Sequence, residues 1–525
     1  MPDQGDIGGP DHNELIVALV AAVGTDITTV ASEVTIGLDQ YGYETVPVRL
    51  SSYLAEEAGK DFSSMPSDEG IWDAMSAGDE LRNKWERGDA LALHAISEIV
   101  ATRQERAPDK EAEVPPPLDR VAFVLRSLKT QDELATLRAV YGPRLVVLAA
   151  YSPREARIAQ LAKEIEASRG TSVTDTWVHQ PEDLVSRDEK EEGSRGQDVS
   201  GTFHRADFFI RGSGQEEIRE DLVRVLDILF GSPFRTPTPD EQGQYMAAGA
   251  ALRSAEFGRQ VGAAVATASG SVVSIGANEV PIAGGGSHWE GKEDGNRDFE
   301  LAGVDTNRQQ FEELAEKLAT HVDGSVASLI EGGEDEDGRL SDLRNKLRHH
   351  LPDELREGGL KDLTEFGRAV HAEMNALLDA ARRGVVVQDA TLYTTTFPCH
   401  NCARHIVGAG IKRVVFIEPY TKSRAEQLHA DSVAIAPVSP QAEKVNFEAF
   451  VGVAPRRYRE LFDAASREQL GYPPRSQDGR AVEFDKRTAV PVFSDAGMAQ
   501  FRPEAREYRA KELLALEHFE KHIDG

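Results

Sequence analysis

The sequence predicts an α/β protein of two domains, and three observations lead to this prediction. Short apolar runs alternate with amphipathic stretches along roughly the first 230 residues. A proline-rich stretch, GSPFRTPTPDE near residue 235, separates them from a second set of strand and helix patterns. With 525 residues, 40% of them hydrophobic and 28% charged, the chain is long enough for two or three globular domains. We place the domains at 1–235 and 236–525.

The first domain carries the pattern of a parallel sheet. Its expected strands are ELIVALVAAV, YETVPVRL, RVAFVLRSL, RLVVLAAYS and ADFFIRG, with helices expected at 27–40, 80–105, 130–142, 153–170 and 216–230. Strands separated by helices indicate βαβ units, whose strands run parallel. The highly charged run SRDEKEEGSRGQD (186–198) predicts a solvent-exposed loop.

The second domain begins with a helix expected at 240–257 and a strand pair, VGAAVATASG and SVVSIGANEV, whose SGS turn suits a hairpin. An insertion of about residues 281–365 follows, with a helical pattern at 306–322 and the acidic loop EGGEDEDG. Next come a helix near His371, the strand ATLYTTTF, a helix after Pro398 and the strand RVVFIEPY. Residues 500–523 read as a charged helix.

Two short segments of this domain predict a metal site. Cys399 and Cys402, the two cysteines of the chain, stand three residues apart directly after Pro398, a residue that starts helices well. Residues at i and i+3 share a helix face, and the amides of a helix N-terminus favour thiolates. His371 stands near the start of another helix, which Gly384 would end. One imidazole and two thiolates are the three protein ligands of a catalytic Zn²⁺ site.

Glu373, two residues after His371, is the expected catalytic residue. Zn²⁺ lowers the pKa of bound water, and a carboxylate beside it can accept that proton and deliver it to a substrate. His400 and His405 lie near the cysteines, and we expect both on the solvent side of their helix. The combination H-x-E…P-C-x-x-C is the signature of zinc-dependent nucleobase deaminases, so the match is a resemblance to a known pattern.

The resemblance extends beyond this signature. HAEMNALLDAARRG, LYTTTFPCHNCARHIVGAGIKRVVFIEPYTKS and GANEVPIAGGGSHWEGKEDGNRDF resemble segments of the two-domain anti-phage dCTP deaminases, and the front half resembles their P-loop, nucleotide-kinase-like domain. The resemblance implies a degenerate P-loop domain and a cytidine-deaminase-like α/β/α sandwich with a mixed five-stranded sheet. It also implies deamination of dCTP, or of dCMP as the alternative substrate, to deoxyuridine nucleotides, which depletes dCTP during phage infection.

By the same resemblance, Asn278 binds the substrate and Arg259 lies near the substrate's phosphate. The resemblance also implies a small inhibitory RNA as a partner and assembly of the chain into a homo-oligomer. One feature departs from the pattern. A working P-loop ends in Gly-Lys-Ser/Thr, whereas AAVGTDITT has no lysine. We therefore expect no ATP-dependent phosphoryl transfer. The first domain has instead a nucleotide-sensing, regulatory, assembly or purely structural role, and any nucleotide would be bound through Gly24, Thr25 and Asp26.

The net charge of −30 argues against a polynucleotide substrate, because such a surface repels phosphate backbones. Alternative interpretations remain open: a housekeeping dCMP deaminase, or a nucleotide- or RNA-sensing protein with an inert deaminase domain. The choice between dCTP and dCMP also stays open. The polar N-terminus and the short apolar runs predict neither a signal peptide nor a membrane span, and the scarcity of cysteine suits the cytoplasm.

Overall fold

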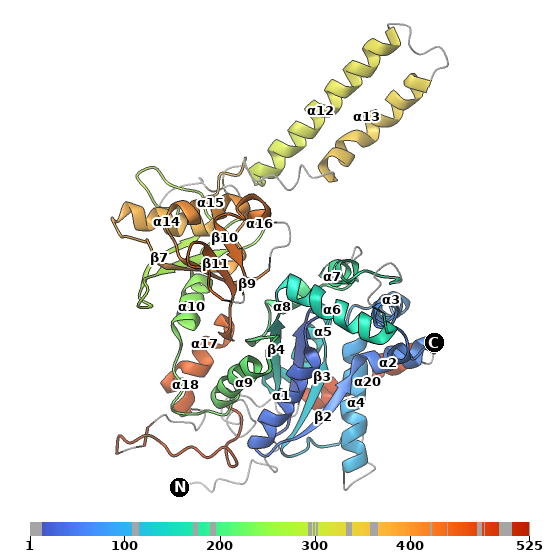
Figure 1. Ribbon diagram of the computed structural model, residues 1–525, viewed down its shortest axis with the longest axis vertical. Helices are drawn as coiled ribbons and strands as arrows, with labels where there is room; N and C mark the ends of the chain where they lie inside the picture. Colours follow the sequence, from blue (N-terminus) through green and yellow to red (C-terminus); the bar gives the residue numbers. More distant parts are fainter. Residues whose placement is uncertain are drawn as a thin grey trace. The chain divides into compact units, whose positions relative to one another are not determined.

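The computed structural model describes residues 13–107, 115–171, 177–189, 196–291, 297, 300, 303–331, 339–357, 366–419, 423–437, 439–469, 475–476, 478–492 and 507–523. The chain forms two compact units (Figure 1). Unit 1 comprises Met1–Tyr245 and Ala449–Gly525, and unit 2 comprises Met246–Glu448. The expected domains, 1–235 and 236–525, have other bounds than these units, since residues 236–245 and the segment from Ala449 onward belong to unit 1.

A six-stranded sheet forms the centre of unit 1, in the order β12-β5-β4-β1-β3-β2. Its strands are β1 (Leu15–Ala21), β2 (Glu44–Arg49), β3 (Val121–Arg126), β4 (Leu145–Tyr151), β5 (Phe208–Arg211) and β12 (Gly452–Val453). The first five run parallel, as the sequence predicts, and β12 pairs antiparallel with β5. The two-residue β12 was not predicted, since so short a segment carries no periodicity.

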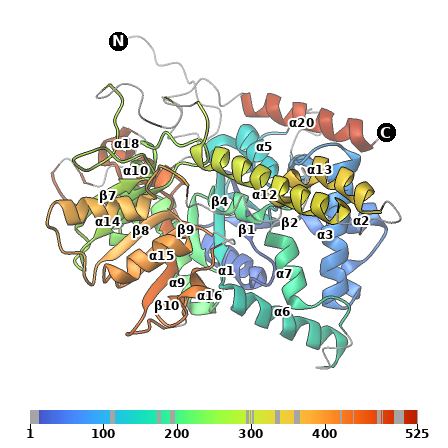
Figure 2. The same ribbon diagram turned by 90° about the horizontal axis from the view of Figure 1, so that it is seen from above.

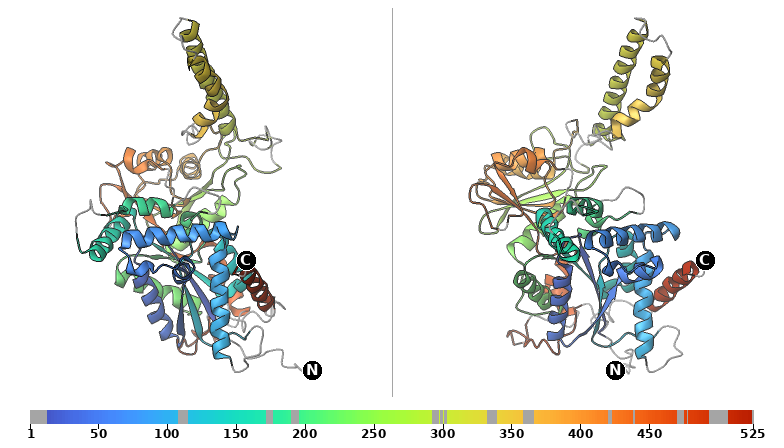
Figure 3. Two further views of the ribbon diagram at one scale, coloured as in Figure 1. Left: turned by 90° about the vertical axis from the view of Figure 1, so that its right-hand side faces the viewer. Right: turned by 45° about the vertical axis from the view of Figure 1, so that its right-hand side comes forward.

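Helices cover the two faces of this sheet (Figure 3). The α-helices of unit 1 include α1 (Ile27–Gln40), α2 (Leu50–Ala58), α3 (Ser67–Lys84), α4 (Ala90–Arg106), α5 (Gln131–Tyr141), α6 (Arg154–Arg169), α7 (Pro181–Glu189), α8 (Val199–Phe203), α9 (Gln215–Leu229), α17 (Pro455–Phe462), α18 (Ala464–Gln469) and α20 (Glu507–Ile523). Leu15, Val17 and Leu19 of β1 form one core cluster with apolar residues of α1 and α9. The alternate residues of β1 are also buried and point to the opposite face, which explains its unbroken apolar sequence.

The charged run at 186–198 differs from its prediction as a solvent-exposed loop. Residues 186–189 complete α7, and the Asp188 carboxylate is fully buried. Its Oδ1 accepts a hydrogen bond from Lys129 Nζ at 2.7 Å, and its Oδ2 accepts one from the Val23 amide at 2.7 Å. A buried carboxylate with these two donors is electrostatically satisfied, which composition alone does not reveal. Residues 190–195 lie outside the described residues.

A second six-stranded sheet forms unit 2, in the order β10-β11-β9-β8-β6-β7. Its strands are β6 (Gly262–Ala266), β7 (Val272–Ala277), β8 (Thr391–Thr396), β9 (Arg413–Glu418), β10 (Val433–Ile435) and β11 (Val445–Ala449). The predicted β6–β7 hairpin is confirmed, and the sheet is mixed, because β6 pairs antiparallel and β8–β9 pair parallel. The expectation of five strands is corrected to six, because the three-residue β10 pairs with β11 at one edge.

The helices of unit 2 include α14 (Ala372–Arg382), α15 (His400–Gly408) and α16 (Ala425–Leu428), while α10 (Pro239–Ala251) spans the unit boundary. Figure 2 shows α14 and α15 side by side, and the two helices contact each other.

The insertion contains α12 (Thr306–Glu331) and α13 (Arg339–Glu357), which pack together and are joined by an ion pair between Arg344 and Asp323 at 2.7 Å. The acidic loop predicted at 331–338 lies, from residue 332 on, outside the described residues. None of the described helices combines the length and the apolar character that crossing a bilayer requires.

Gly276 in β7 allows α14 to lie directly on the sheet. A Cβ at this position would come well within 3.0 Å of the Ala372 carbonyl oxygen and the Ala376 amide. We expect Gly276→Val to destabilise the protein by about 3 kcal/mol, because backbone atoms cannot move aside as a flexible side chain would. The measurement is chemical denaturation together with zinc content. Gly258→Val, at a glycine with no neighbour within 4 Å, is the control, and equal losses in the two variants would contradict this interpretation.

Candidate metal centre

The residues of the predicted metal site lie at the N-termini of two neighbouring helices. His371 is the N-cap residue of α14, and Cys399 is the N-cap residue of α15, with Cys402 in its first turn. The residue before His371 is held by a short antiparallel bridge, in which Val370 and Glu279 exchange backbone hydrogen bonds of 3.1 and 3.2 Å. The start of α14 is thereby attached to the segment that follows β7.

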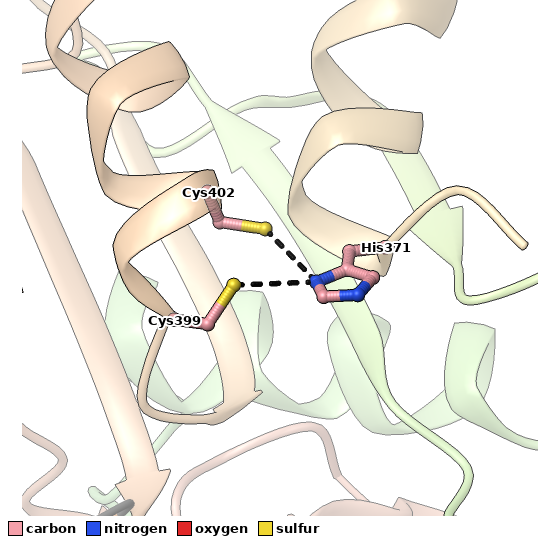
Figure 4. A group of neighbouring side chains, drawn as sticks. All are labelled: His371, Cys399 and Cys402. Carbon is pink, nitrogen blue, oxygen red and sulfur yellow. Dashed lines mark hydrogen bonds between the residues drawn. The ribbon is translucent and has the colours of Figure 1, made fainter. Parts of the chain in front are cut away.

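The geometry of the three side chains fits a tetrahedral metal ion. Nδ1 of His371 lies 3.4 Å from Sγ of Cys399 and 3.4 Å from Sγ of Cys402 (Figure 4). A tetrahedral Zn²⁺ with usual Zn–N and Zn–S bonds separates nitrogen from sulfur by about 3.5 Å. All three ligand atoms lie within 4.8 Å of one another, and within the described part of the chain this is the group of His, Cys, Asp or Glu side chains suited to an ion. The donor set is consistent with Zn²⁺.

The electrostatics of the site favour a thiolate. The hydrogen bond with Cys402 lowers the pKa of Cys399 to about 3. The hydrogen bond with Cys399 in turn raises the pKa of His371 to about 9. A metal ligand must be a thiolate or a neutral imidazole, so loading of a cation would displace the His371 proton.

Glu373 lies in the first turn of α14, two residues after His371, and is 4% exposed. Burial raises the pKa of its carboxyl above the usual value. A carboxyl in such surroundings is well suited to take up and release a proton during a reaction. His400 and His405, expected on the solvent side, are half-buried and stand outside the metal-ligand group; Nδ1 of His405 lies 2.6 Å from the Asn401 carbonyl oxygen.

Asn278 and Arg259, the predicted substrate-binding residues, lie at the open end of the β6–β7 hairpin. The Asn278 side chain accepts a hydrogen bond from the Val261 amide at 2.7 Å and donates one to the Arg259 carbonyl at 2.8 Å. The Arg259 guanidinium forms an exposed ion pair with Glu418 at 2.8 Å. Asn278 thus holds the entry to β6 in place, and the role of both residues in substrate binding stays a prediction.

Gly24, Thr25 and Asp26 form the turn between β1 and α1 in unit 1. Gly24 has a positive φ of 82°, as the tight turn requires. Asp26 caps α1 by accepting hydrogen bonds from the Thr29 amide and hydroxyl at 3.0 and 2.6 Å. The Thr25 side chain is buried, and its hydroxyl has no hydrogen-bond partner among the described residues. Their predicted role in nucleotide binding is not tested by these contacts.

Two residues that position the site were missed in the sequence. Glu279 is fully buried, and its carboxylate accepts hydrogen bonds from the Val280 and Ala255 amides at 2.9 and 3.3 Å. Asn375, one turn after His371, donates to the Ala277 carbonyl and to the Ser287 hydroxyl, each at 2.8 Å. Glu279 belongs to the segment GANEVP and Asn375 to the segment HAEMNA, each beside apolar neighbours. A polar residue in such a place is expected to be buried and hydrogen-bonded, and this was the signal available in the sequence.

We expect Cys402→Ser to weaken zinc binding by at least about 100-fold, because loss of a ligand costs more than loss of an outer-shell partner, which costs 10- to 100-fold. The measurement is zinc stoichiometry by elemental analysis after dialysis against a weak chelator. His405→Asn, on the same helix but outside the metal-ligand group, is the control and should retain its zinc. Full zinc occupancy in Cys402→Ser would contradict this ligand assignment.

Residues 237–418 match the model of the cytidine and deoxycytidylate deaminase zinc-binding region, which is less than half of the chain. The deoxycytidylate deaminase of Enterobacteria phage T4 is 47% identical over 55 residues, 10% of this chain and 28% of that protein. ComE operon protein 2 of Bacillus subtilis (strain 168) is 41% identical over 73 residues, 14% of this chain and 39% of that protein. The chain therefore spans less than half the length of these curated relatives.

Among solved structures, the dCMP deaminase from the cyanophage S-TIM5, in complex with dCMP and dUMP, is 18% identical over 41% of this chain and 100% of that chain, with a TM-score of 0.22. A bifunctional deaminase/reductase from Thermotoga maritima is 13% identical over 46% of this chain and 48% of that chain, with a TM-score of 0.21. Structural likeness at these TM-scores supports no inference about this chain.

Proposed function

We propose that this protein catalyses the zinc-dependent hydrolytic deamination of free deoxycytidine nucleotides. The observation that carries the proposal is the His371–Cys399–Cys402 group with the buried Glu373 two residues from its imidazole ligand. This group lies within the region that matches the deaminase zinc-binding model. In the reaction, water replaces the 4-amino group of cytosine, so that a C4 carbonyl forms and ammonia leaves.

The chain's own residues divide the work in the proposed reaction. His371, Cys399 and Cys402 would hold Zn²⁺, and when bound the ion supplies a Lewis acid that activates water for attack. Glu373 takes up one proton of the attacking water and delivers it to the ring nitrogen N3 of cytosine. It then takes up the second proton, from the new C4 hydroxyl, and delivers it to the amino group, which leaves as ammonia. Its burial suits the acceptor step, because the burial raises the pKa of the carboxyl and so makes the carboxylate a better proton acceptor.

For the substrate, we propose dCTP, with depletion of the dCTP pool in phage defence as the biological role. The support is the sequence resemblance to two-domain anti-phage dCTP deaminases, together with a net charge of −30, which suits a small nucleotide better than a polynucleotide. A small inhibitory RNA and a homo-oligomeric state belong to the same proposal. The names of the curated relatives favour dCMP, in nucleotide metabolism, as the second candidate.

The test is purified, zinc-loaded protein assayed against CMP, CDP and CTP and their deoxy forms, with products identified by mass. We expect dCTP to lose ammonia fastest, with the ribonucleotides much slower. Preference for dCMP would overturn the dCTP assignment but not the deaminase. Turnover of none of the six, by protein with full zinc occupancy, would favour an inert deaminase domain and overturn the proposal.

The defence role has its own test. Cells producing the wild-type protein should lose dCTP after phage infection and yield fewer phage, whereas cells producing an equal amount of Glu373→Gln should not. Equal phage yields from wild-type and Glu373→Gln cells, in the presence of an active purified enzyme, would overturn the role in defence and leave the reaction standing.

A further inference from the structure

The hairpin that α12 and α13 form in unit 2 takes no part in the proposed reaction. The two helices lie side by side (Figure 1), and among the described elements each has its extensive contact with the other. Phe311 and Ala315, near the start of α12, are the buried residues in the described part of the hairpin. Helices that bury so little are marginal by themselves, because most of the stability of a helix comes from packing of its apolar face.

The face of α12 that meets α13 is marked by the ion pair of Asp323 with Arg344 at 2.7 Å. Half-buried residues follow one another here at intervals of four and three, so they share one face of the helix. They are Ala319, Asp323, Val326 and Ile330.

A second stripe of α12 is apolar and exposed. Leu318, Val322 and Leu329 each stand one residue before a member of the contact face, so they lie about 100° around the helix from it. Phe311, seven residues before Leu318 and on the same stripe, is buried, and its ring lies 5.6 Å from that of Phe366. The apolar stripe therefore continues along α12 beyond the part that this aromatic contact covers.

Leu343 extends the exposed surface onto α13. It stands one residue before Arg344, which faces α12. Because the two helices of a hairpin run antiparallel, the residues that precede the contact face point to the same side of the hairpin in both helices. Leu318, Val322, Leu329 and Leu343 are between 36% and 46% exposed. A single exposed leucine is ordinary, whereas large apolar side chains gathered on one face indicate an interface.

The spacing of the stripe is that of a coiled-coil seam. From Leu318 to Val322, Ser325 and Leu329 the intervals are four, three and four residues, as at the a and d positions of a heptad. Such stripes pack against each other in four-helix bundles. A two-fold axis brings the same surface of two copies together, so a second copy of the hairpin supplies a matching stripe.

The charges of the two helices favour one arrangement of two hairpins. α12 contains five carboxylates and two lysines or arginines, whereas α13 contains four carboxylates and five lysines or arginines. A two-fold axis parallel to the helices places α12 of one copy over α13 of the other, so helices of opposite net charge meet. An axis across the helices would instead place α12 over α12.

The parallel axis also fixes which side chains meet. Asp323 pairs with Arg344 within one hairpin, so the residues before them, Val322 and Leu343, lie at the same level. A rotation about an axis along the helices keeps that level. Val322 of one copy therefore lies opposite Leu343 of the other.

We propose that this face of the hairpin, made by Leu318, Val322, Leu329 and Leu343, binds the same face of a second copy of the chain, with α12 of each copy against α13 of the other. The assembly is a four-helix bundle in which each helix is antiparallel to its neighbours. The proposal rests on the homo-oligomeric state within the proposed function and does not depend on the deaminase reaction.

The test is sedimentation velocity of the full, zinc-loaded protein over a range of concentrations. Val322→Glu and Leu343→Lys should each weaken self-association at least about tenfold, because each buries an unpaired charge in an apolar contact. Glutamate and lysine are good helix formers, so both variants should keep the helix content of the wild type, which circular dichroism checks. Thr320→Glu, with the same new charge at an exposed position on the opposite side of α12, is the matched control and should associate like the wild type.

A mixture of the two variants tests the pairing of α12 with α13. In a mixed pair the new carboxylate of one copy lies beside the new ammonium group of the other, so the equimolar mixture of Val322→Glu and Leu343→Lys should associate more tightly than either variant alone. Two weakened variants whose mixture shows no recovery would overturn this pairing.

Two further outcomes separate the hairpin face from the rest of the proposed function. A wild-type protein that stays monomeric overturns the proposal together with the homo-oligomeric state. An assembly that neither variant weakens overturns the hairpin face alone, because another surface must then join the copies and the hairpin is left for a different partner. The nucleotide assay tests the reaction separately from both.

Discussion

Glu373→Gln should retain zinc and lose about 100- to 10,000-fold in kcat, because glutamine keeps the shape of the side chain but cannot carry a proton. Glu373 is 4% exposed, so a base from the solvent cannot readily take over its role as proton carrier. Burial also raises the pKa of its carboxyl, which makes the carboxylate a better proton acceptor than an exposed one. The measurement pairs zinc stoichiometry with the initial rate of ammonia release from dCTP and dCMP, so that loss of metal and loss of chemistry are separated.

The control for this variant is Glu426→Gln, an exposed glutamate of α16 in the same unit. It has the same change in charge and should keep its full rate. A Glu373→Gln protein that binds zinc and turns over within tenfold of the wild type would show that another group carries the proton.

Arg103→Met should destabilise unit 1 by about 3–5 kcal/mol, the usual cost of removing one partner of a buried ion pair. Arg103 of α4 is fully buried between two carboxylates: Nη2 lies 2.5 Å from Glu14 Oε1, and Nη1 lies 2.8 Å from Glu512 Oε1 of α20. Methionine fills a similar volume but leaves both carboxylates without a counter-charge. Chemical denaturation followed by circular dichroism measures the loss.

Arg106→Met is the matched control, because Arg106 is on the same helix, is 38% exposed and pairs with the exposed Glu44. It should change the free energy of unfolding by less than about 1 kcal/mol. If Arg103→Met and Arg106→Met lower the free energy of unfolding by the same amount, the buried ion pairs of Arg103 contribute no more to stability than an exposed pair does. The triple variant with Glu14→Leu and Glu512→Leu should regain much of the loss, because it removes the uncompensated charges.

The pH dependence of this loss follows from the same contacts. Burial raises the pKa of Glu512 even with Arg103 present, and removal of Arg103 must raise it further. A carboxyl whose pKa is higher in the folded state favours folding most at low pH, and this contribution disappears as the pH rises through the folded pKa. The deficit of Arg103→Met should therefore be smaller at mildly acidic pH than at neutral pH.

Local patterns were sufficient to predict much of the fold and the three side chains that the structure brings together in a group suited to a metal ion. β1 and β4 are unbroken apolar runs because both faces of their sheet are covered, and the hairpin of β6 and β7 follows from its turn. Ligand spacing is equally local: Cys399 and Cys402 share one turn of α15, and His371 with Glu373 share the start of α14. These features depend on residues that are only a few positions apart, so they can be predicted from the amino-acid sequence.

Contacts between distant residues could not be read in this way. The burial of Asp188 depends on an amide 165 positions earlier, and Arg103 meets Glu512 across 409 positions. The return of Ala449 onward to unit 1 and the bridge from Glu279 to Val370 are of the same kind. Periodicity reports which face of an element is buried but not its partner. The amino-acid order therefore determined most of the elements and indicated the His and Cys residues that lie together in a group suited to a metal ion, whereas only packing in three dimensions decided which buried charges are paired.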